Sequence, residues 1–307
     1  MLPLVPSMRG SVRKNATAGS LLFLTLLISS RSLGVPSANV LVVLSSDSPI
    51  YQDALTGFKE TCKSPIQTQI LGNSKGPAAD SSKIVVTFGR RAAEKTFPAS
   101  TTRIYCLDPG LVVGQGSSGG RQIVVTISPT PEALLSGLQK IQPHMKRLAM
   151  FWVSPTFSDY YNDIRNAGQA MGVEVHAEKM ESSGDFPERL RAVIGHVDAL
   201  WVAPDFRLIT PTTFAVAKAF GRSNNLPLYV AIDNLVDIGA VAAIAPDFHE
   251  MGRTAGRLTT QVLSGDIGNV TRVYPEKSFL TINLTTAAQS GLTIPEKVIR
   301  EAHRVVR

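Results

Sequence analysis

Polar residues follow four short apolar runs in the second half of the chain, each within two positions of the run. The runs read RLAMFWV, DALWVA, PLYVAI and AVAAIA, and the polar residues behind them are Ser154, Asp205, Asp233 and Asp247. A carboxylate in such a position can pair with the ammonium group of a ligand, and a hydroxyl can donate a hydrogen bond to a ligand carboxylate. Such contacts are stronger where water is excluded. The pattern therefore indicates binding of a small polar molecule, and Thr156 supplies a second hydroxyl beside Ser154.

Each of these side chains also has a purely structural interpretation. Asp and Ser are common N-caps of helices that follow strands, because their side-chain oxygens accept hydrogen bonds from the first helical N–H groups. For Asp205, Asp233 and Ser154 both interpretations stay open. For Asp247, which precedes a long helical segment, we favour capping.

A similar loop occurs in the first half of the chain. Ser45, Ser46 and Asp47 follow an apolar run at residues 39–44. Arg90 stands at the start of a short helical segment and can bind an anionic group of a ligand, although a solvated surface arginine is the simpler interpretation.

Four aromatic residues near these loops are candidates for stacking on an aromatic ligand: Tyr51, Trp152, Tyr160 and Phe206. For Trp152 we favour packing in the core, because tryptophan is highly buried on average. The other three stay open candidates for ligand contact.

The apolar runs and the segments between them predict an α/β fold. Near-continuous apolar strands separated by amphipathic helices are typical of a parallel sheet that is buried on both faces. Strands are expected at residues 39–44, 65–71, 83–88, 102–107, 122–127, 147–153, 198–203, 227–232, 240–245 and 278–283. Helices are expected at residues 51–62, 90–96, 132–141, 157–171, 186–194, 211–223, 249–263 and 284–290. In such sheets ligands bind outside the carboxyl ends of the strands, which is where the polar residues stand.

Length and charge limit the possible functions. A chain of 307 residues is long enough for two compact domains. The formal net charge is +7, but basic residues at positions 9, 13, 14 and 31 precede the first acidic residue. Subtracting these four from the 31 basic residues leaves 27 against 24 acidic residues, a net charge of +3. The remaining basic residues are scattered and are not interleaved with aromatic residues, which argues against a nucleic-acid-binding surface.

Residues 1–34 have the pattern of a secretory signal peptide. Basic residues precede the apolar run GSLLFLTLLIS, and small residues at positions 32 and 34 mark a cleavage site. The run is shorter than the roughly 20 residues that a membrane-spanning helix needs. No cysteine follows it that could carry a lipid. We therefore expect export to the periplasm, with an uncleaved membrane anchor as the alternative.

Cysteine and histidine patterns give little support for a metal site or for catalysis. An exported chain can join Cys62 and Cys106 in a disulfide or keep both as buried thiols. With no third cysteine and no clustered histidines, neither a metal nor a cofactor is predicted. The loop GSSGG at residues 116–120 fits the G-x-S-x-G pattern only formally, because it is not placed between a strand and a helix. Enzymatic activity is therefore not predicted.

The last third of the chain carries a specific set of motifs. The segment HEMGRTAGRLTTQVLSGD is a Gly- and Ala-bearing helix that ends in L-x-G, and the tail from Asn283 to Pro295 fits N-x-x-x-A-x-x-x-G-L-x-I-P. In both, the chain resembles the ABC-transporter substrate-binding proteins called the ABC_sub_bind or TrpX-like family. The first half matches less evenly: GRRAA at residues 89–93 has Arg90 where the family has Thr, and residues 72–82 form a shortened crossover. At residues 119–124, GGRQIV lacks the Asn and Thr of the family's glycine-rich loop.

The resemblance implies a type I periplasmic-binding fold, in which two Rossmann-like lobes are joined by a hinge and enclose a ligand. Lobe 1 would comprise residues 35–143 and 248–275, and lobe 2 residues 144–247 and 276–307. The implied function is the periplasmic solute-binding component of an ABC transporter, which offers a small organic ligand, often an amino acid, to a membrane permease. The residues expected to contact the ligand are Ser45, Ser46, Asp47, Arg90, Ser154, Thr156, Asp205 and Asp233.

Two other functions stay open. The same fold can serve as a periplasmic sensor or regulatory protein that informs a membrane receptor or kinase, and the shortened first half favours this somewhat. A third possibility is a member of the family that has lost its ligand.

Overall fold

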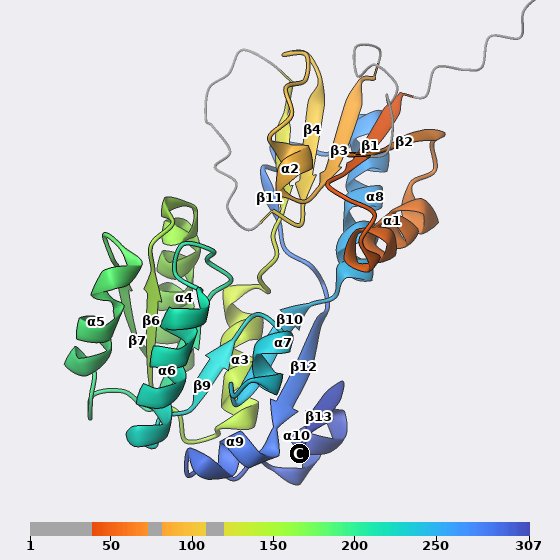
Figure 1. Ribbon diagram of the computed structural model, residues 1–307. Helices are drawn as coiled ribbons and strands as arrows, with labels where there is room; N and C mark the ends of the chain where they lie inside the picture. The colour runs from red at the N-terminus through yellow and green to blue at the C-terminus, as the bar shows by residue number, and fades with distance from the viewer. Residues whose placement is uncertain (1–38, 73–81, 109–119) are drawn as a thin grey trace, which may run out of the picture. The chain divides into compact units, whose positions relative to one another are not determined.

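The computed structural model describes residues 39–72, 82–108 and 120–307. The predicted signal peptide, most of the shortened crossover and the glycine-rich loop at residues 114–119 lie outside the described residues. The strands form two separate sheets (Figure 1). Within the described ranges, no helix is long and apolar enough to span a membrane.

The first sheet has six parallel strands in the order β11-β5-β4-β3-β1-β2. The strands are β1 (Val40–Leu44), β2 (Ile66–Ile70), β3 (Ile84–Phe88), β4 (Thr102–Cys106), β5 (Gln122–Val125) and β11 (Arg272–Val273). Helices α1 (Pro49–Thr61) and α8 (Phe248–Ser264) lie side by side on one face (Figure 1). The short helix α2 (Arg90–Ala93) packs on the opposite face. Because β1 and β3 are covered on both faces, every residue of these two strands is buried.

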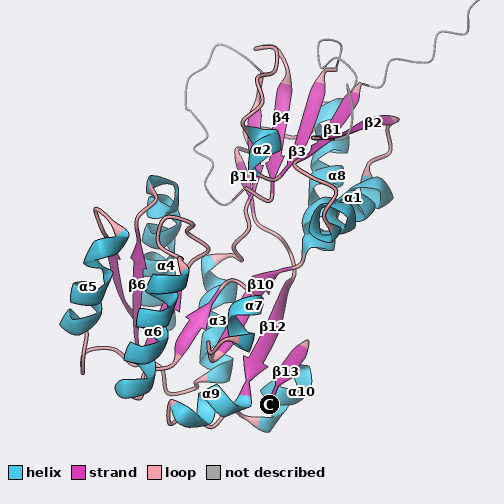
Figure 2. Ribbon diagram, in the orientation of Figure 1, coloured by secondary structure: helices cyan, strands magenta, loops and turns pink. Residues whose placement is uncertain are grey.

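The second sheet has seven strands in the order β13-β12-β10-β9-β8-β6-β7, and only the pair β10–β12 is antiparallel within this sheet. The strands are β6 (Arg147–Trp152), β7 (Glu174–Lys179), β8 (Ala199–Val202), β9 (Leu228–Val230), β10 (Ala242–Pro246), β12 (Ser278–Asn283) and β13 (Arg304–Val306). Helices cover both of its faces (Figure 2). One face carries α3 (Pro131–Ile141), α4 (Ser158–Met171), α9 (Leu284–Gln289) and α10 (Glu296–Glu301). The other carries α5 (Phe186–Ala192), α6 (Pro211–Ser223) and α7 (Asn234–Asp237).

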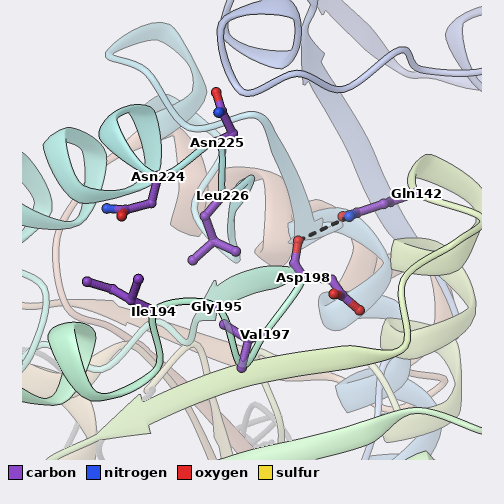
Figure 3. Close-up of a pocket in the computed structure, with 8 residues that line it drawn as sticks. All are labelled: Gln142, Ile194, Gly195, Val197, Asp198, Asn224, Asn225 and Leu226. Carbon is purple, nitrogen blue, oxygen red and sulfur yellow. Dashed lines mark hydrogen bonds between the residues drawn. The ribbon is translucent and has the colours of Figure 1, made fainter.

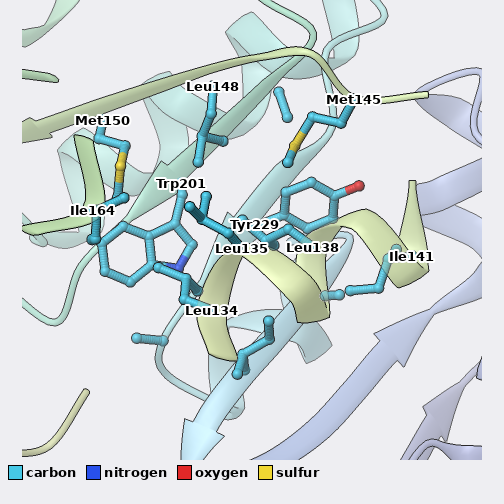
Figure 4. Packing of buried hydrophobic residues seen from close by; sticks show 14 of the residues in the cluster. Leu134, Leu135, Leu138, Ile141, Met145, Leu148, Met150, Ile164, Trp201 and Tyr229 are labelled. Carbon is cyan, nitrogen blue, oxygen red and sulfur yellow. The ribbon is translucent and has the colours of Figure 1, made fainter. Parts of the chain in front are cut away.

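The core of the second sheet follows from the alternation of side chains along its strands. Neighbouring residues of a strand point to opposite faces. Met150 and Trp201 therefore join the cluster under α3 and α4, whereas Phe151 and Leu200 join the cluster under α5 and α6. Figure 4 shows the first cluster, in which Trp201 and Tyr229 lie among aliphatic side chains.

Helices α1 and α8 approach so closely that their contact requires glycine. A Cβ atom on Gly252 would lie 1.8 Å from the carbonyl oxygen of Ala54, and one on Gly57 would lie 2.1 Å from the carbonyl oxygen of His249. Gly256 is crowded by the backbone of α1 in the same way. The glycines of the predicted Gly- and Ala-bearing helix thus allow two helices far apart in sequence to pack backbone against backbone.

Three strands of the structure were not predicted. β7 forms an edge of the second sheet, and its sequence EVHAEK has too few apolar residues to resemble a buried strand. β11 has only two residues. β13 follows α10 after two residues, near the end of the chain, where no strand was predicted.

Helix α3 packs with the second sheet, although residues 132–141 were predicted to belong to the first lobe. Its buried leucines and Ile141 join the cluster that contains Met145, Leu148 and Trp201. The preceding strand, β5, belongs to the first sheet. The chain therefore leaves the first sheet before α3 and not after it, because the apolar face of α3 fits the second sheet.

Candidate functional site

The strand order reverses once in each sheet, and most of the predicted site residues follow the strands beside these reversals. In the first sheet β1 lies between β2 and β3, and in the second sheet β6 lies between β7 and β8. At such a switch point the loops behind neighbouring strands diverge and leave a crevice for a ligand. The residues in the four loops are Ser45, Ser46, Asp47 and Arg90 in the first sheet, and Ser154, Thr156 and Asp205 in the second. Asp233 is the exception, because it follows β9.

The carboxylate of Asp205 joins the two loops at the switch point of the second sheet. Asp205 is fully buried, and its Oδ2 accepts hydrogen bonds from the backbone N–H groups of Val153 and Ser154, both at 2.8 Å. Its Oδ1 accepts hydrogen bonds from the Ser154 hydroxyl and from the backbone N–H of Arg207. Both carboxylate oxygens are thus occupied. Asp205 neither caps α6, whose N-cap is Thr210, nor presents a free carboxylate to a ligand.

The pairing of Asp205 with Ser154 follows from the register of the sheet. Strands β6 and β8 pair with Met150 opposite Trp201. The same spacing, continued past the ends of both strands, places Ser154 opposite Asp205. Short polar side chains at these two positions therefore meet across the crevice.

The switch point of the first sheet is closed by a similar contact. The buried Ser45 hydroxyl accepts a hydrogen bond from the backbone N–H of Ala92 at 3.0 Å. Gly89 has a φ of 89°, and a Cβ atom there would lie 2.7 Å from the Ser45 hydroxyl oxygen and 2.4 Å from the Tyr51 hydroxyl oxygen. Only glycine combines this backbone conformation with so close an approach. Ser45 therefore holds the loop after β1 against α2.

Arg90 and Phe206 present exposed groups at the strand ends. The guanidinium carbon of Arg90 lies 4.6 Å from the centroid of the Phe206 ring, a cation–π contact. The Arg90 Nε also donates a hydrogen bond to Glu94 at 2.7 Å. The Arg90 side chain is 56% exposed, and Phe206 is 42% exposed. These side chains, unlike Asp205 and Ser45, are accessible to a ligand.

The remaining residues of the loops differ in their surroundings. The Thr156 hydroxyl oxygen is buried and has no hydrogen-bond partner within the described part of the chain. Ser46 is half-buried. Asp47 is exposed, and its Oδ1 accepts a hydrogen bond from Gln52 at 2.5 Å. Thr156 is therefore the residue of the second-sheet loops with a hydroxyl left to pair.

Asp233 and Asp247 make contacts within the protein. Asp233 accepts hydrogen bonds from Arg304, at 2.7 Å, and from the Thr281 hydroxyl. Sequence reasoning missed Arg304, because it lies 71 residues after Asp233 and in a strand that was not predicted. Asp247 accepts a hydrogen bond from the backbone N–H of Glu250 at 2.9 Å, which confirms the predicted cap of α8.

The aromatic candidates separate into core and surface. Trp152 is buried and stacks on Tyr161 with ring centroids 4.2 Å apart, which confirms its predicted place in the core. Tyr160 is also buried, and its hydroxyl donates a hydrogen bond to the carbonyl of Pro129 at 2.9 Å. Only Phe206 of the four is exposed, while Tyr51 is half-buried.

Both cysteines are free thiols. Cys106 is buried and Cys62 is half-buried, and burial raises the pKa of each thiol. Across residues 39–72, 82–108 and 120–307, no group of three or more His, Cys, Asp or Glu side chains is placed to hold a metal ion.

A separate cavity of about 290 Å³ lies at the amino ends of β8 and β9 (Figure 3). Its lining includes Ile194, Asn225 and Leu226, and the Gln142 amide donates a hydrogen bond to the carbonyl oxygen of Asp198 at 3.1 Å. None of the eight predicted site residues lines it. The cavity is therefore at the amino ends of the strands, whereas the predicted site is at their carboxyl ends.

Comparison with known families found one match that covers more than half of the chain. Residues 132–306 match the model of a family described as ABC transporter substrate binding protein. Comparison with curated proteins found no match.

Solved structures give likenesses over most of the chain. An ABC domain from Streptococcus pneumoniae in complex with L-Trp is 19% identical, with a TM-score of 0.58 over 87% of this chain and 99% of that one. A conserved domain protein from Vibrio cholerae is 17% identical, with a TM-score of 0.58 over 87% of this chain and 98% of that one. A ligand-free, open substrate binding protein with adhesive properties from Clostridium difficile is 14% identical, with a TM-score of 0.60 over 87% of this chain and 98% of that one. At these identities the likeness shows the fold, and it confirms the predicted α/β fold class.

Proposed function

Because the chain belongs to the family of ABC transporter substrate binding proteins, we propose that it is the exported solute-binding component of an ABC transporter. In this function it encloses a small organic ligand between two lobes, one around each sheet, and offers the ligand to a membrane permease. The complex of the Streptococcus pneumoniae neighbour with L-Trp supports a small organic solute as the class of ligand.

One observation supports the proposed position of the site: seven of the eight predicted residues, all except Asp233, lie in the loops at the switch points of the two sheets. There Ser45 and Asp205 hold neighbouring loops together by buried hydrogen bonds. Arg90, Phe206 and the Thr156 hydroxyl are left to meet a ligand. Such an arrangement is typical of a binding site: buried polar contacts hold the loops in place, and other side chains contact the ligand.

The proposed location is the periplasm, with residues 1–34 acting as the signal peptide. The mass of the protein recovered from the periplasm of a bacterial host tests this directly. Cleavage after position 34 is expected. Recovery of the uncleaved chain in the membrane fraction would instead support the anchor.

Ligand binding can be tested by thermal unfolding of the purified protein in the presence of amino acids, organic acids and small amines. A ligand that binds only the folded state stabilises it by about 2.7 kcal/mol at 100 times its dissociation constant. For a protein of this size such a gain raises the melting temperature by several degrees.

Two exposed apolar side chains offer a matched pair of variants. Phe206 is 42% exposed at the proposed site, and Ile194 is 48% exposed beside the separate cavity. Phe206→Ala is expected to reduce the ligand-induced shift, and Ile194→Ala to leave it unchanged. Absence of a shift across the whole panel would contradict the proposed function and favour the ligandless member. Binding by the protein without any effect on transport in cells would favour a sensor.

A further inference from the structure

The aspartates near the strand ends of both sheets are engaged within the protein. Asp205 is buried and accepts four hydrogen bonds, and four further aspartates each have a partner. Their partners are Gln52 for Asp47, Arg304 for Asp233 and for Asp237, and the backbone N–H of Glu250 for Asp247. At Asp205, Asp233 and Asp237 both carboxylate oxygens already accept hydrogen bonds, so a ligand ammonium group would have to displace a contact to pair with them.

Cationic groups remain accessible in the same loops. Arg90 and Arg207 are both exposed, and the Arg90 guanidinium makes a cation–π contact with the Phe206 ring. Arg90 uses Nε for its contact with Glu94, the charge of Asp108 also acts on it, and its side chain is more than half exposed. A guanidinium in contact with a ring can still use its two terminal nitrogens to bind a carboxylate.

The pair of Arg90 with Glu94 does not prevent ligand binding. Both side chains are more than half exposed, at 56% and 58%. Exposed ion pairs of this kind contribute little to stability, so the guanidinium can turn toward a ligand at small cost.

We propose that the site selects an anionic ligand, a carboxylic acid that lacks an ammonium group, and that Arg90 and Phe206 determine this selectivity. This inference rests on the proposed function. The ligand carboxylate pairs with the terminal nitrogens of Arg90, and its apolar or aromatic body lies along the Phe206 ring. A zwitterionic amino acid would bring its ammonium group to loops in which Asp205 and Asp233 already have partners on both carboxylate oxygens.

Two matched series of probes, measured by isothermal titration calorimetry, separate charge from shape. The aromatic series is 3-phenylpropionate, L-phenylalanine and 2-phenylethylamine, and the aliphatic series is valerate, L-norvaline and butylamine. Within each series only the charged groups differ. The carboxylates are expected to bind at least about tenfold more tightly than the zwitterions, because both carry the carboxylate but only the zwitterion must desolvate an ammonium group that finds no free partner. Sodium sulfate serves as a control for binding of a simple inorganic anion.

Variants in α2 test the assignment to Arg90. Arg90→Gln is expected to weaken carboxylate binding by roughly 10- to 100-fold. Arg91→Gln, an exposed neighbour in the same helix, is the matched control and should leave the affinity unchanged. Circular dichroism and the melting temperature show that both variants are folded.

The possible outcomes separate the two proposals. Equal binding of zwitterions and carboxylates, unaffected by Arg90→Gln, would overturn anion selectivity and leave solute binding intact. Tight binding of the amines would overturn it as well. Absence of binding in both series and in the wider thermal screen would overturn both proposals. Carboxylate binding that is lost with Arg90→Gln and kept with Arg91→Gln supports both.

Discussion

The Ser154 hydroxyl donates a hydrogen bond to the Asp205 carboxylate, although the two residues are 51 positions apart in the sequence. The contact lies at the ends of two neighbouring parallel strands, and both residues are buried. Two residues that were each predicted to contact a ligand are therefore hydrogen-bonded to one another. Their joint effect is to fix the loop that carries Thr156.

Asp205→Asn is expected to reduce the free energy of unfolding by about 2–4 kcal/mol. The substituted amide keeps the shape of the side chain but replaces one acceptor oxygen with a donor that faces N–H groups, and buried hydrogen bonds to a charged group contribute about 1.5–3 kcal/mol each. Denaturation by urea measures the change. Asp159→Asn, whose side chain is 79% exposed, is the control and should change stability by less than about 0.5 kcal/mol. Loss of ligand binding at unchanged stability would instead show that Asp205 contacts the ligand.

Gly252→Ala is expected to reduce stability by about 2 kcal/mol, even though alanine favours helix more than glycine does. The added methyl group would lie 1.8 Å from the Ala54 carbonyl oxygen, so α1 and α8 must separate. Gly184→Ala is the control, because its nearest obstacle is the movable Ser182 hydroxyl at 3.3 Å. Thermal unfolding of the two variants compares them. Equal stability of Gly252→Ala and the native protein would show that the helices are not in backbone contact.

Stability is expected to fall slightly as the pH rises from 6 to 8.5, because His249 bridges two carboxylates of α1. Its Nδ1 lies 3.1 Å from Asp53 Oδ1 and its Nε2 lies 3.1 Å from Glu60 Oε1. The hydrogen bond to Asp53, followed by that to Glu60, raises the pKa of His249 in the folded state. The stabilisation is thus fully present below the unfolded pKa of about 6.5 and is lost as the pH rises through the folded value.

The corresponding measurement compares the native protein with His249→Gln at several pH values above 5.5. In this range Glu60 stays ionised, because its contacts with His249 and Arg253 lower its pKa. The difference in unfolding free energy should be under about 1 kcal/mol, as for exposed ion pairs, and should shrink with rising pH. A difference that grows with pH would contradict the bridging role of protonated His249.

Both cysteines are expected to react with a thiol reagent only slowly in the native protein. Burial raises the pKa of the Cys106 thiol well above its usual range and, to a smaller extent, that of Cys62, so little thiolate is present at pH 8. After unfolding in guanidinium without reductant, two thiols per chain should react. Failure of both to react after unfolding would reveal a disulfide.

The sequence predicted the α/β class and the positions of most strands because these depend on local apolar patterns. It also located the strand ends that carry Ser45, Arg90, Ser154 and Asp205. It did not predict β7, since an exposed edge strand such as EVHAEK lacks the apolar run that marks the buried strands.

What each polar side chain does at the strand ends could not be predicted, because its partner comes from elsewhere in the fold. Asp205 is occupied by the loop after β6, and Asp233 by Arg304 in the last strand. A local pattern cannot distinguish such a residue from one that faces a ligand. The sheet on which α3 packs could not be predicted for the same reason. Its apolar face packs on the second sheet, although the strand before it belongs to the first.

The first sheet depends on segments from both halves of the chain, and this has a consequence for biosynthesis. Residues of α8, such as Met251 and Ala255, complete the core under β1 and β3, and β11 adds the edge strand beside β5. During synthesis the ribosome must therefore make residues 248–273 before the N-terminal strands can find their covering helix. Until then the early part of the chain stays incompletely folded. A protein built in this order leaves its first sheet accessible to chaperones until most of the chain has been translated.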